Sequence, residues 1–249
     1  MSVTKWLSNL FKYGPGEAGR ARKKQDRMRR RQAQFETERW QQHGDQMDRR
    51  YQDYAEYLSH QASKLPRIED RLIRKEEQRF LDFQERFRGS RTLRSPKAVL
   101  CLGARLGTEV RAMHQLGHFA VGLDLNPGET NPYVLPGDFH KTVFPDDSVD
   151  VVYTNALDHV FDLGRVIREV CRILCRDGTF ITDVVPGYEE GFMPGEFESH
   201  HWATVDHLID DICRAAPLSL VSRRELGSAG SGVWSQLEFV KSPRYEPED

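Results

Sequence analysis

Two glycines and one aspartate occupy positions that are typical of a nucleotide-binding site. Gly103 and Gly107 follow one apolar run, and Asp124 ends the next apolar run. Glycines let the backbone approach a ligand, and an acid at the tip of the second strand can accept hydrogen bonds from two ribose hydroxyls. This strand–turn–helix–strand pattern predicts a nucleotide site, although a tight turn without a ligand would show the same glycines.

Five segments, in order, resemble the motifs of class I S-adenosylmethionine-dependent methyltransferases, in particular a type 11-like domain. They are 99–107 (VLCLGARLG), 121–124 (VGLD), 137–139 (GDF), 144–155 (FPDDSVDVVYTN) and 168–180 (REVCRILCRDGTF). The resemblance covers about residues 97–241. It implies an α/β fold: a Rossmann-like, seven-stranded, mostly parallel sheet with a C-terminal antiparallel hairpin. It also implies S-adenosyl-L-methionine as the cofactor.

The same resemblance assigns the cofactor contacts. It implies that Asp124 binds the ribose and that Asp138 binds the adenine amino group, although both could be ordinary turn carboxylates. The sequence departs from the motif at Cys101, where an acid is usual, and at Arg105, where the middle glycine is usual. Arg105 could form a salt bridge to the methionine carboxylate. The cofactor-binding residues implied are Gly103, Ala104, Arg105, Gly107, Asp124, Leu125, Asp138, Phe139 and Asn155.

A second polar group follows the expected fourth strand. Asn155, Asp158 and His159 lie at its carboxyl end, where ligands gather in parallel sheets. His159 and Asp158 are the candidate catalytic residues because an unperturbed imidazole suits a general base. A helix-capping aspartate and a surface histidine explain them equally well. The Asn/Asp-Pro-Pro-Tyr motif of amino-group methyltransferases is absent, which favours an oxygen acceptor. Residues 200–202 (HHW) could line the acceptor cleft or form a helix-entry loop.

The elements that would position these residues alternate between strand and helix. Such alternation indicates a parallel sheet with right-handed crossovers. Gly117 is expected to end the first helix in a left-handed conformation. Strands are expected near 97–102, 119–124, 132–135, 149–154, 178–185, 217–225 and 233–240, and helices near 108–116, 163–175 and 202–215.

The first 95 residues have no counterpart in the resemblance, so we expect two parts: a basic helical extension at 1–95 and the methyltransferase domain at 96–249. Residues 17–61 contain no proline and predict a polar helix. A second helix is expected after Ser63, with Pro66 in its first turn. Its apolar face predicts docking onto the domain or onto another helix, and oligomerisation through these helices is possible. That face consists of Ile68, Leu72, Phe80, Phe83 and Phe87.

Charge is divided unevenly along the 249 residues. Residues 1–95 carry 23 Lys and Arg against 14 Asp and Glu, whereas residues 96–249 carry 13 against 24. Such asymmetry is informative about partners rather than about the fold. The four cysteines form no disulfide or zinc pattern. No apolar run approaches the roughly 18 residues of a membrane span. We therefore expect a cytoplasmic protein.

Residues 1–31 combine two signals for a membrane surface. Val3, Trp6, Leu7, Leu10 and Phe11 share one helical face, and residues 20–31 hold eight basic side chains. Together they predict attachment to an anionic membrane surface, such as the inner face of a membrane. A nucleic-acid partner would contact the basic side chains and leave the apolar face unused. The other alternative is that this terminus docks on its own domain. A peripheral location would suit a lipid-linked or envelope-glycan acceptor.

Two functions from different classes remain open on the sequence. The first is an active methyltransferase that needs no metal and acts on a hydroxyl of a small molecule or saccharide. The second is a catalytically degenerate binding or scaffold protein whose basic arm contacts membrane, nucleic acid or a protein. Cys101 and Arg105 favour the second, and Asp124, Asp138 and Asn155 favour the first.

The membrane prediction can be tested by co-sedimentation with anionic and neutral vesicles at two salt concentrations. We expect binding to anionic vesicles only, weakening with salt, because each basic side chain near such a surface contributes about 1 kcal/mol. The double variant Trp6→Ala and Phe11→Ala should lose it. If this variant sediments like the wild type, the apolar face is no anchor.

Overall fold

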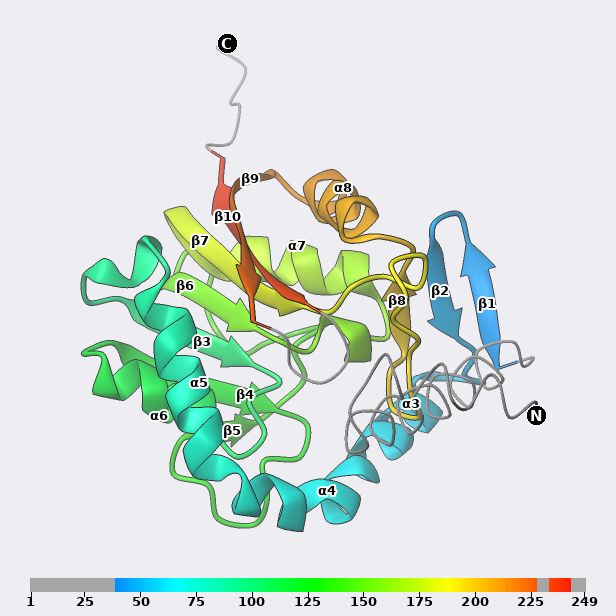
Figure 1. The fold of residues 1–249 in the computed structure, drawn as a ribbon, viewed down its shortest axis with the longest axis horizontal. Coiled ribbons are helices and arrows are strands. Elements are labelled where there is room, and N and C mark those ends of the chain that lie inside the picture. The colour runs from blue at the N-terminus through cyan, green and yellow to red at the C-terminus, as the bar shows by residue number, and fades with distance from the viewer. Residues whose placement is uncertain (1–38, 228–232, 243–249) are drawn as a thin grey trace, which may run out of the picture.

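The computed structural model describes residues 39–227 and 233–242, so the predicted segment at 1–31 lies outside the described residues. Figure 1 shows one central sheet with helices on both faces and a small second sheet beside it. The strands are β1 (Trp40–His43), β2 (Gln46–Arg49), β3 (Ala98–Leu102), β4 (Phe119–Asp124), β5 (Val134–Pro136), β6 (Val149–Thr154), β7 (Leu174–Val184), β8 (His200–Trp202), β9 (Leu218–Leu226) and β10 (Trp234–Lys241). The helices are α3 (Tyr54–Ala62), α4 (Lys64–Arg74), α5 (Glu76–Arg88), α6 (Thr108–Gln115), α7 (Leu163–Ile173) and α8 (Val205–Ala215), with single 3₁₀ turns at Thr92–Arg94 and Leu157–His159.

The central sheet confirms the predicted fold class. Its strand order is β5-β4-β3-β6-β7-β10-β9. The pairs from β5 to β7 are parallel, and β10 is antiparallel to both β7 and β9. The chain therefore brings the carboxyl ends of β3, β4 and β6 to one edge, where binding residues can meet.

Each face of the sheet has its own apolar core. On one face α5 and α6 pack against side chains of β3 and β6, such as Cys101 and Tyr153. On the other face α7 and α8 cover β6, β7 and β10, as Figure 1 shows. The N-cap of α7 is Asp162, whose carboxylate accepts a hydrogen bond from the backbone N–H of Arg165 at 2.8 Å. Gly117, at φ +87°, follows α6 as expected.

The prediction of one helix over 17–61 is wrong for residues 40–53, whereas its last part, 54–61, lies in the observed helix α3. Residues 40–49 form the β1–β2 hairpin around Gly44, whose φ is +60°. Residues 46–48 then pair with β8, so two distant segments complete one three-stranded sheet. This pairing satisfies the backbone of β8, and the predicted helix at 202–215 consequently begins only at Val205.

The predicted second helix is broken at Lys75, whose φ of −108° and ψ of 7° separate α4 from α5. Ser63 does not cap α4, because its hydroxyl donates to the carbonyl of His60 instead. The expected docking face nevertheless packs on the domain. The ring of Phe87 lies 4.9 Å from that of Tyr153, edge to face, and Phe83 stacks beside Phe87.

A buried ion pair joins α5 to the sheet. The carboxylate of Asp183, which is 2% exposed, accepts hydrogen bonds from Arg86 at 3.1 Å, Tyr153 at 2.8 Å and Gln236 at 2.9 Å. Three donors thus satisfy the carboxylate of Asp183. A buried charge requires such partners because unpaired charges are costly away from water.

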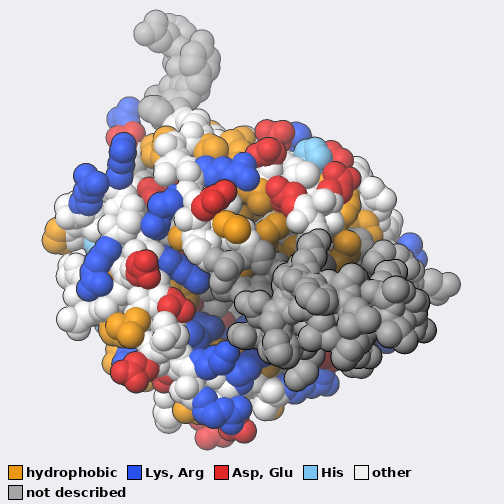
Figure 2. All heavy atoms as spheres, in the orientation of Figure 1, with side chains coloured by type: hydrophobic (Ala, Val, Ile, Leu, Met, Phe, Trp, Pro, Cys, Tyr) orange, Lys and Arg blue, Asp and Glu red, His pale blue; other side chains and the backbone are white. Residues whose placement is uncertain are grey.

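Surface charge follows the asymmetry in the sequence. Figure 2 shows Lys and Arg side chains spread over the face on which α4 and α5 lie. The exposed basic residues of α4, of α5 and of the break between them are Arg67, Arg71, Arg74, Lys75 and Arg88. None of the helices in the described ranges is long and apolar enough to cross a membrane.

The Arg86–Asp183 pair predicts a large loss of stability on truncation. Arg86→Met should lower the free energy of unfolding by about 3–5 kcal/mol, because it leaves Asp183 buried beside an apolar chain. The matched control is Arg67→Met, whose pair with Glu196 is 57% and 58% exposed. That change should cost about 1 kcal/mol or less. Urea unfolding followed by circular dichroism measures both, and equal losses would contradict the assignment.

Candidate functional site

The turn between β3 and α6 contains three residues with positive φ. Gly103 has φ +68°, Arg105 +45° and Gly107 +78°. A side chain at Gly103 would meet Ala156 Cβ at 2.8 Å, and one at Gly107 would meet Tyr133 Cβ at 2.8 Å. Glycine at these two positions is therefore required both by the backbone conformation and by the close approach of neighbouring segments.

Asp124 closes this turn from the end of β4. One carboxylate oxygen accepts the backbone N–H of Arg105 at 2.9 Å, and the other accepts that of Asn126 at 2.8 Å. Burial raises the pKa of Asp124, while these bonds and the Arg105 charge oppose the rise. A carboxylate has about four acceptor positions, so two backbone bonds leave capacity for further donors such as hydroxyls.

Asp138, after β5, lies in an aromatic cluster beside this site. Its carboxylate accepts hydrogen bonds from the hydroxyl of Tyr54, from the backbone N–H of His140 at 2.8 Å and from the His140 ring at 2.8 Å. Burial alone would raise the pKa of Asp138, but these hydrogen bonds lower it to about 2. Asp138 is therefore ionised at neutral pH and already engaged by α3.

The predicted catalytic pair lies in the 3₁₀ turn after β6. His159 Nδ1 donates to the carbonyl of Phe197 at 2.8 Å, so Nε2 is left as an acceptor. Lys64 Nζ lies 2.5 Å from that Nε2. The Asp158 carboxylate is 3.7 Å from His159 Nε2, and the two side chains are only 14% and 17% exposed.

Burial changes the proton affinity of all three groups. Burial and the positive charge of Lys64 lower the pKa of His159 to about 3, far below the ordinary value on which the sequence prediction relied. Burial and the charge of Arg105 lower the pKa of Lys64 to about 7. Burial and the neighbouring Glu198 raise the pKa of Asp158. At neutral pH the imidazole is neutral, whereas Lys64 and Asp158 both have pKa values of about 7 and can exchange protons.

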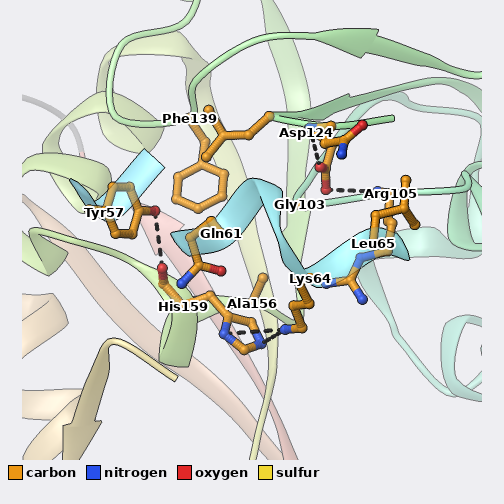
Figure 3. A pocket seen from close by; sticks show the side chains of 12 residues that line it. Tyr57, Gln61, Lys64, Leu65, Gly103, Arg105, Asp124, Phe139, Ala156 and His159 are labelled. Atoms are coloured by element: carbon orange, nitrogen blue, oxygen red, sulfur yellow. Dashed lines mark hydrogen bonds between the residues drawn. The ribbon is translucent and has the colours of Figure 1, made fainter. Parts of the chain in front are cut away.

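A small cavity lies between the turn and α3–α4. Figure 3 shows Lys64 reaching His159 on one side and Arg105 lying beside Asp124 on the other. Its volume is about 40 Å³. The lining residues are Tyr57, Gln61, Lys64, Leu65, Gly103, Arg105, Asp124, Leu125, Asn126, Phe139, Ala156 and His159.

Six of the predicted site residues line this cavity: Gly103, Arg105, Asp124, Leu125, Phe139 and His159. The other five predicted residues do not line it: Ala104, Gly107, Asp138, Asn155 and Asp158. The sequence prediction missed six lining residues: Asn126 and Ala156 of the domain, and Tyr57, Gln61, Lys64 and Leu65 of α3 and α4. No local motif marks the last four, because two helices outside the matched motifs carry them. Residues 200–202 form β8 and do not line this cavity.

The cavity groups fit S-adenosylmethionine. The turn glycines leave space that a Cβ would fill, and Asp124 retains acceptor capacity at the wall. The Lys64 amine and the Arg105 guanidinium face the same space. Among the described residues, no three His, Cys, Asp or Glu side chains come together in a way that could hold a metal ion.

Comparisons with known proteins agree with this geometry. Residues 100–182 match the family described as a methyltransferase domain. No curated protein sequence matches the chain. Among solved structures, the 1,6-didemethyltoxoflavin-N1-methyltransferase of Burkholderia thailandensis, with 1,6-didemethyltoxoflavin and S-adenosylhomocysteine bound, has a TM-score of 0.63 at 15% identity, covering 82% of this chain and 99% of its own.

Two further structures are similar over less of the chain. A putative methyltransferase of Haloferax volcanii, in complex with the Trm112 activator, has a TM-score of 0.57 at 18% identity, covering 74% of this chain and 99% of its own. A possible histamine N-methyltransferase of Thermotoga maritima has a TM-score of 0.57 at 13% identity, covering 74% and 100%. With the matched motifs, these findings identify a methyltransferase domain at residues 100–182 and give the chain the fold of S-adenosylmethionine-dependent methyltransferases, which indicates S-adenosylmethionine as the cofactor.

Proposed function

We propose that this protein transfers the methyl group of S-adenosylmethionine to a hydroxyl oxygen of a small molecule or saccharide. The observation that favours oxygen as the methyl-accepting atom is Lys64. Its part-buried amine lies at the cavity wall and has its pKa lowered to about 7. A hydroxyl must lose its proton to become a good nucleophile, so it needs a nearby base. A neutral amine acceptor already carries a lone pair and needs none before transfer.

We assign each part of the cofactor to particular residues. Asp124 holds the ribose hydroxyls, and Asp138 with Phe139 holds the adenine. The turn residues Gly103, Ala104 and Gly107, together with Leu125 and Asn155, shape the remaining wall. The bound cofactor supplies a methyl group on a positively charged sulfur, which makes it a strong donor.

Lys64 takes the role that the sequence prediction gave to His159. The neutral amine donates one hydrogen to His159 Nε2 and presents its lone pair to the acceptor hydroxyl. His159 is held in this tautomer by its bond to the Phe197 carbonyl. When Lys64 accepts the proton, the neighbouring Asp158 stabilises the ammonium ion, because its negative charge raises the pKa of Lys64.

The cofactor reaches its site only when α3 and α4 move. The cavity of about 40 Å³ is far below the roughly 300–1,000 Å³ of pockets for ligands of this size. Tyr54 also occupies the Asp138 carboxylate that would receive the adenine amino group. We therefore expect α3–α4 to form a cover that opens on binding.

The alternative of a degenerate scaffold is not proposed, because the groups that would bind the cofactor are retained. Two of the similar structures are named as nitrogen methyltransferases, but at 13–15% identity they share only the fold. A lipid-linked or envelope-glycan acceptor at an anionic membrane stays a prediction of residues 1–31.

Cofactor binding by Asp124 can be tested with Asp124→Asn, which keeps one oxygen for the backbone bonds but loses the charge. Hydrogen bonds to a charged group contribute about 1.5–3 kcal/mol. We expect the affinity for S-adenosylmethionine to fall roughly 10- to 100-fold, and the thermal shift at a fixed concentration to shrink accordingly. Asp70→Asn, on the exposed side of α4, is the control. An equal shift in Asp124→Asn and wild type would refute the assignment.

The acceptor chemistry can be tested by following S-adenosylhomocysteine release with paired acceptors that differ only in carrying a hydroxyl or an amine. We expect transfer to hydroxyl compounds, with a rate that rises with pH through about 7 as Lys64 loses its proton. Lys64→Met should lower this rate about 100-fold or more and remove the rise, since general bases contribute about 10²–10⁴-fold.

Lys75→Met, at the other end of α4, is the control and should retain both rate and pH profile. Thermal melting of each variant checks that it is folded. Preferred transfer to amines would refute the oxygen proposal. An unchanged pH profile in folded Lys64→Met would refute the role of Lys64.

A further inference from the structure

The small sheet carries three polar side chains on one face. Asp48 of β2 lies directly opposite His200 of β8 in their antiparallel register, and Gln46 is two residues before Asp48 on the same strand. Residues two apart on a strand share a face, and so do directly opposed residues of neighbouring strands. Figure 1 shows β2 and β8 side by side, next to α7 and α8.

A groove of about 490 Å³ lies against this face. Its other walls are the start of α7, from Phe161 to Gly164, and the last turn of α8, from Asp211 to Ala215. We call it the β2–β8 groove. Its volume falls within the roughly 300–1,000 Å³ of pockets for small organic ligands. None of its lining residues lines the cofactor cavity, so it is a separate space.

His200 lines this groove with an unsatisfied ring nitrogen. Its side chain is 2% exposed, and its Nδ1 lies 2.7 Å from Oδ1 of Asp48. An ionised carboxylate only accepts, so Nδ1 carries the hydrogen and Nε2 of the neutral ring is left as an acceptor. No group among the described residues bonds that buried Nε2. A buried polar atom without a partner is costly, so a ligand that donates a hydrogen to it would gain affinity.

Two carboxylates of the groove also retain acceptor positions. Asp48 uses Oδ1 for His200, and Asp162 uses Oδ1 for the backbone N–H of Arg165. The second oxygen of each accepts no hydrogen bond from the part of the chain that the structure describes. Together with His200 Nε2, these oxygens favour a ligand that carries hydrogen-bond donors.

Charge and shape narrow the ligand further. Asp211 is a third carboxylate of the lining, and it accepts hydrogen bonds from Gln46 and from Arg214, the only Lys or Arg side chain of the lining in the described ranges. Three acids against one base attract a cation. The start of α7 and the end of α8 bring partial charges of opposite sign, which offset each other. Phe161, which is 39% exposed, and Leu163 give the groove an apolar part.

We propose that the β2–β8 groove is a second ligand site, which binds an organic ammonium ion with a short apolar body. The ligand donates an N–H to His200 Nε2, and its charge lies beside Asp48. Packed aromatic rings separate this site from the cofactor cavity: the ring centroids of Phe161, which lines the groove, and Tyr57, which lines the cavity, are 5.3 Å apart. The site goes beyond the proposed function and is independent of the methyl acceptor.

Phenethylamine and phenethyl alcohol are matched probes, because they differ only in carrying an ammonium or a hydroxyl group. Their binding to the full-length protein is measured by calorimetry, with and without saturating S-adenosylhomocysteine to fill the cofactor cavity. We expect the amine to bind at least about 10-fold more tightly than the alcohol, since hydrogen bonds between charged groups are the stronger ones. S-adenosylhomocysteine should leave the affinity for the amine unchanged.

Two variants test the groups that would hold the amine. His200→Asn keeps a side-chain N–H for Asp48 but removes Nε2, and Asp48→Asn removes the charge. Each should weaken binding of the amine roughly 10- to 100-fold. Asp206→Asn is the matched control, because it removes the same charge from the exposed start of α8, and it should change the affinity less than about threefold. In the wild type, the amine should also shift the nitrogen resonance of His200 Nε2.

Thermal melting checks that each variant is folded, and Asp48→Asn with the resonance of His200 decides the matter if His200→Asn does not fold. Equal binding of the two probes, or binding of neither, would overturn the proposal. Equal losses in Asp48→Asn and Asp206→Asn would overturn it too, since they indicate only general attraction between charges. Loss of amine binding on saturation with S-adenosylhomocysteine would place the amine in the cofactor cavity and refute the second site.

These outcomes are separable from failure of the proposed function, because they measure binding and not methyl transfer. Preferred transfer to amines would refute the hydroxyl acceptor, yet binding of phenethylamine beside saturating S-adenosylhomocysteine would stand.

Discussion

The carboxyl edge of the central sheet must hold several charges away from water, and the arrangement around it follows from that constraint. Burial is the largest influence on the pKa of Lys64, Arg105, Asp124 and Asp158. Isolated charges in such surroundings are costly, so opposite charges must share the space. The basic side chains come partly from α4 and the acids from the domain, which places the extension over this edge. At the site, Lys64 of the extension thus meets Asp124 and Asp158 of the domain.

Close packing at the carboxyl edge also restricts the backbone of the glycine turn. Gly103 and Gly107 let Ala156 and Tyr133 approach to distances that a side chain would prevent. The end of β6 therefore packs directly against the turn, and His159 lies three residues beyond Ala156. A residue larger than glycine between these two glycines is held in a conformation it resists, which links the strain at Arg105 to the position of its side chain.

The extension also contacts the domain away from the cavity. The hairpin of β1 and β2 supplies the neighbour that β8 needs, and Asp48 bonds the ring of buried His200 at 2.7 Å. Arg49 donates to the carbonyls of Gly195 and Glu198, each at 2.9 Å. The loop that contains Phe197, which orients His159, is therefore held from the extension side. Contacts of this kind cross the expected boundary at residue 96, which stays a prediction.

The sequence by itself determined the central sheet, its order of motifs and the cavity residues contributed by the turn and by β4. Apolar runs of strand length, glycines with positive φ and an acid at a strand tip are local signals that sequence spacing preserves. The docking of Phe83 and Phe87 was also predictable, because their helical spacing puts both on one face.

Only the tertiary structure decided which other groups complete the site. The β1–β2 hairpin reads as a polar helix, since its strands are short and β2 is stabilised by β8, some 150 residues further along the chain. Lys64 reaches the cavity because the break at Lys75 and the packing of α5 set the path of α4. The pKa of His159 is lowered by burial and by that lysine, neither of which its neighbours in sequence reveal. Proton affinity depends on what surrounds a group in space, and for this site those surroundings come from segments far apart in the chain.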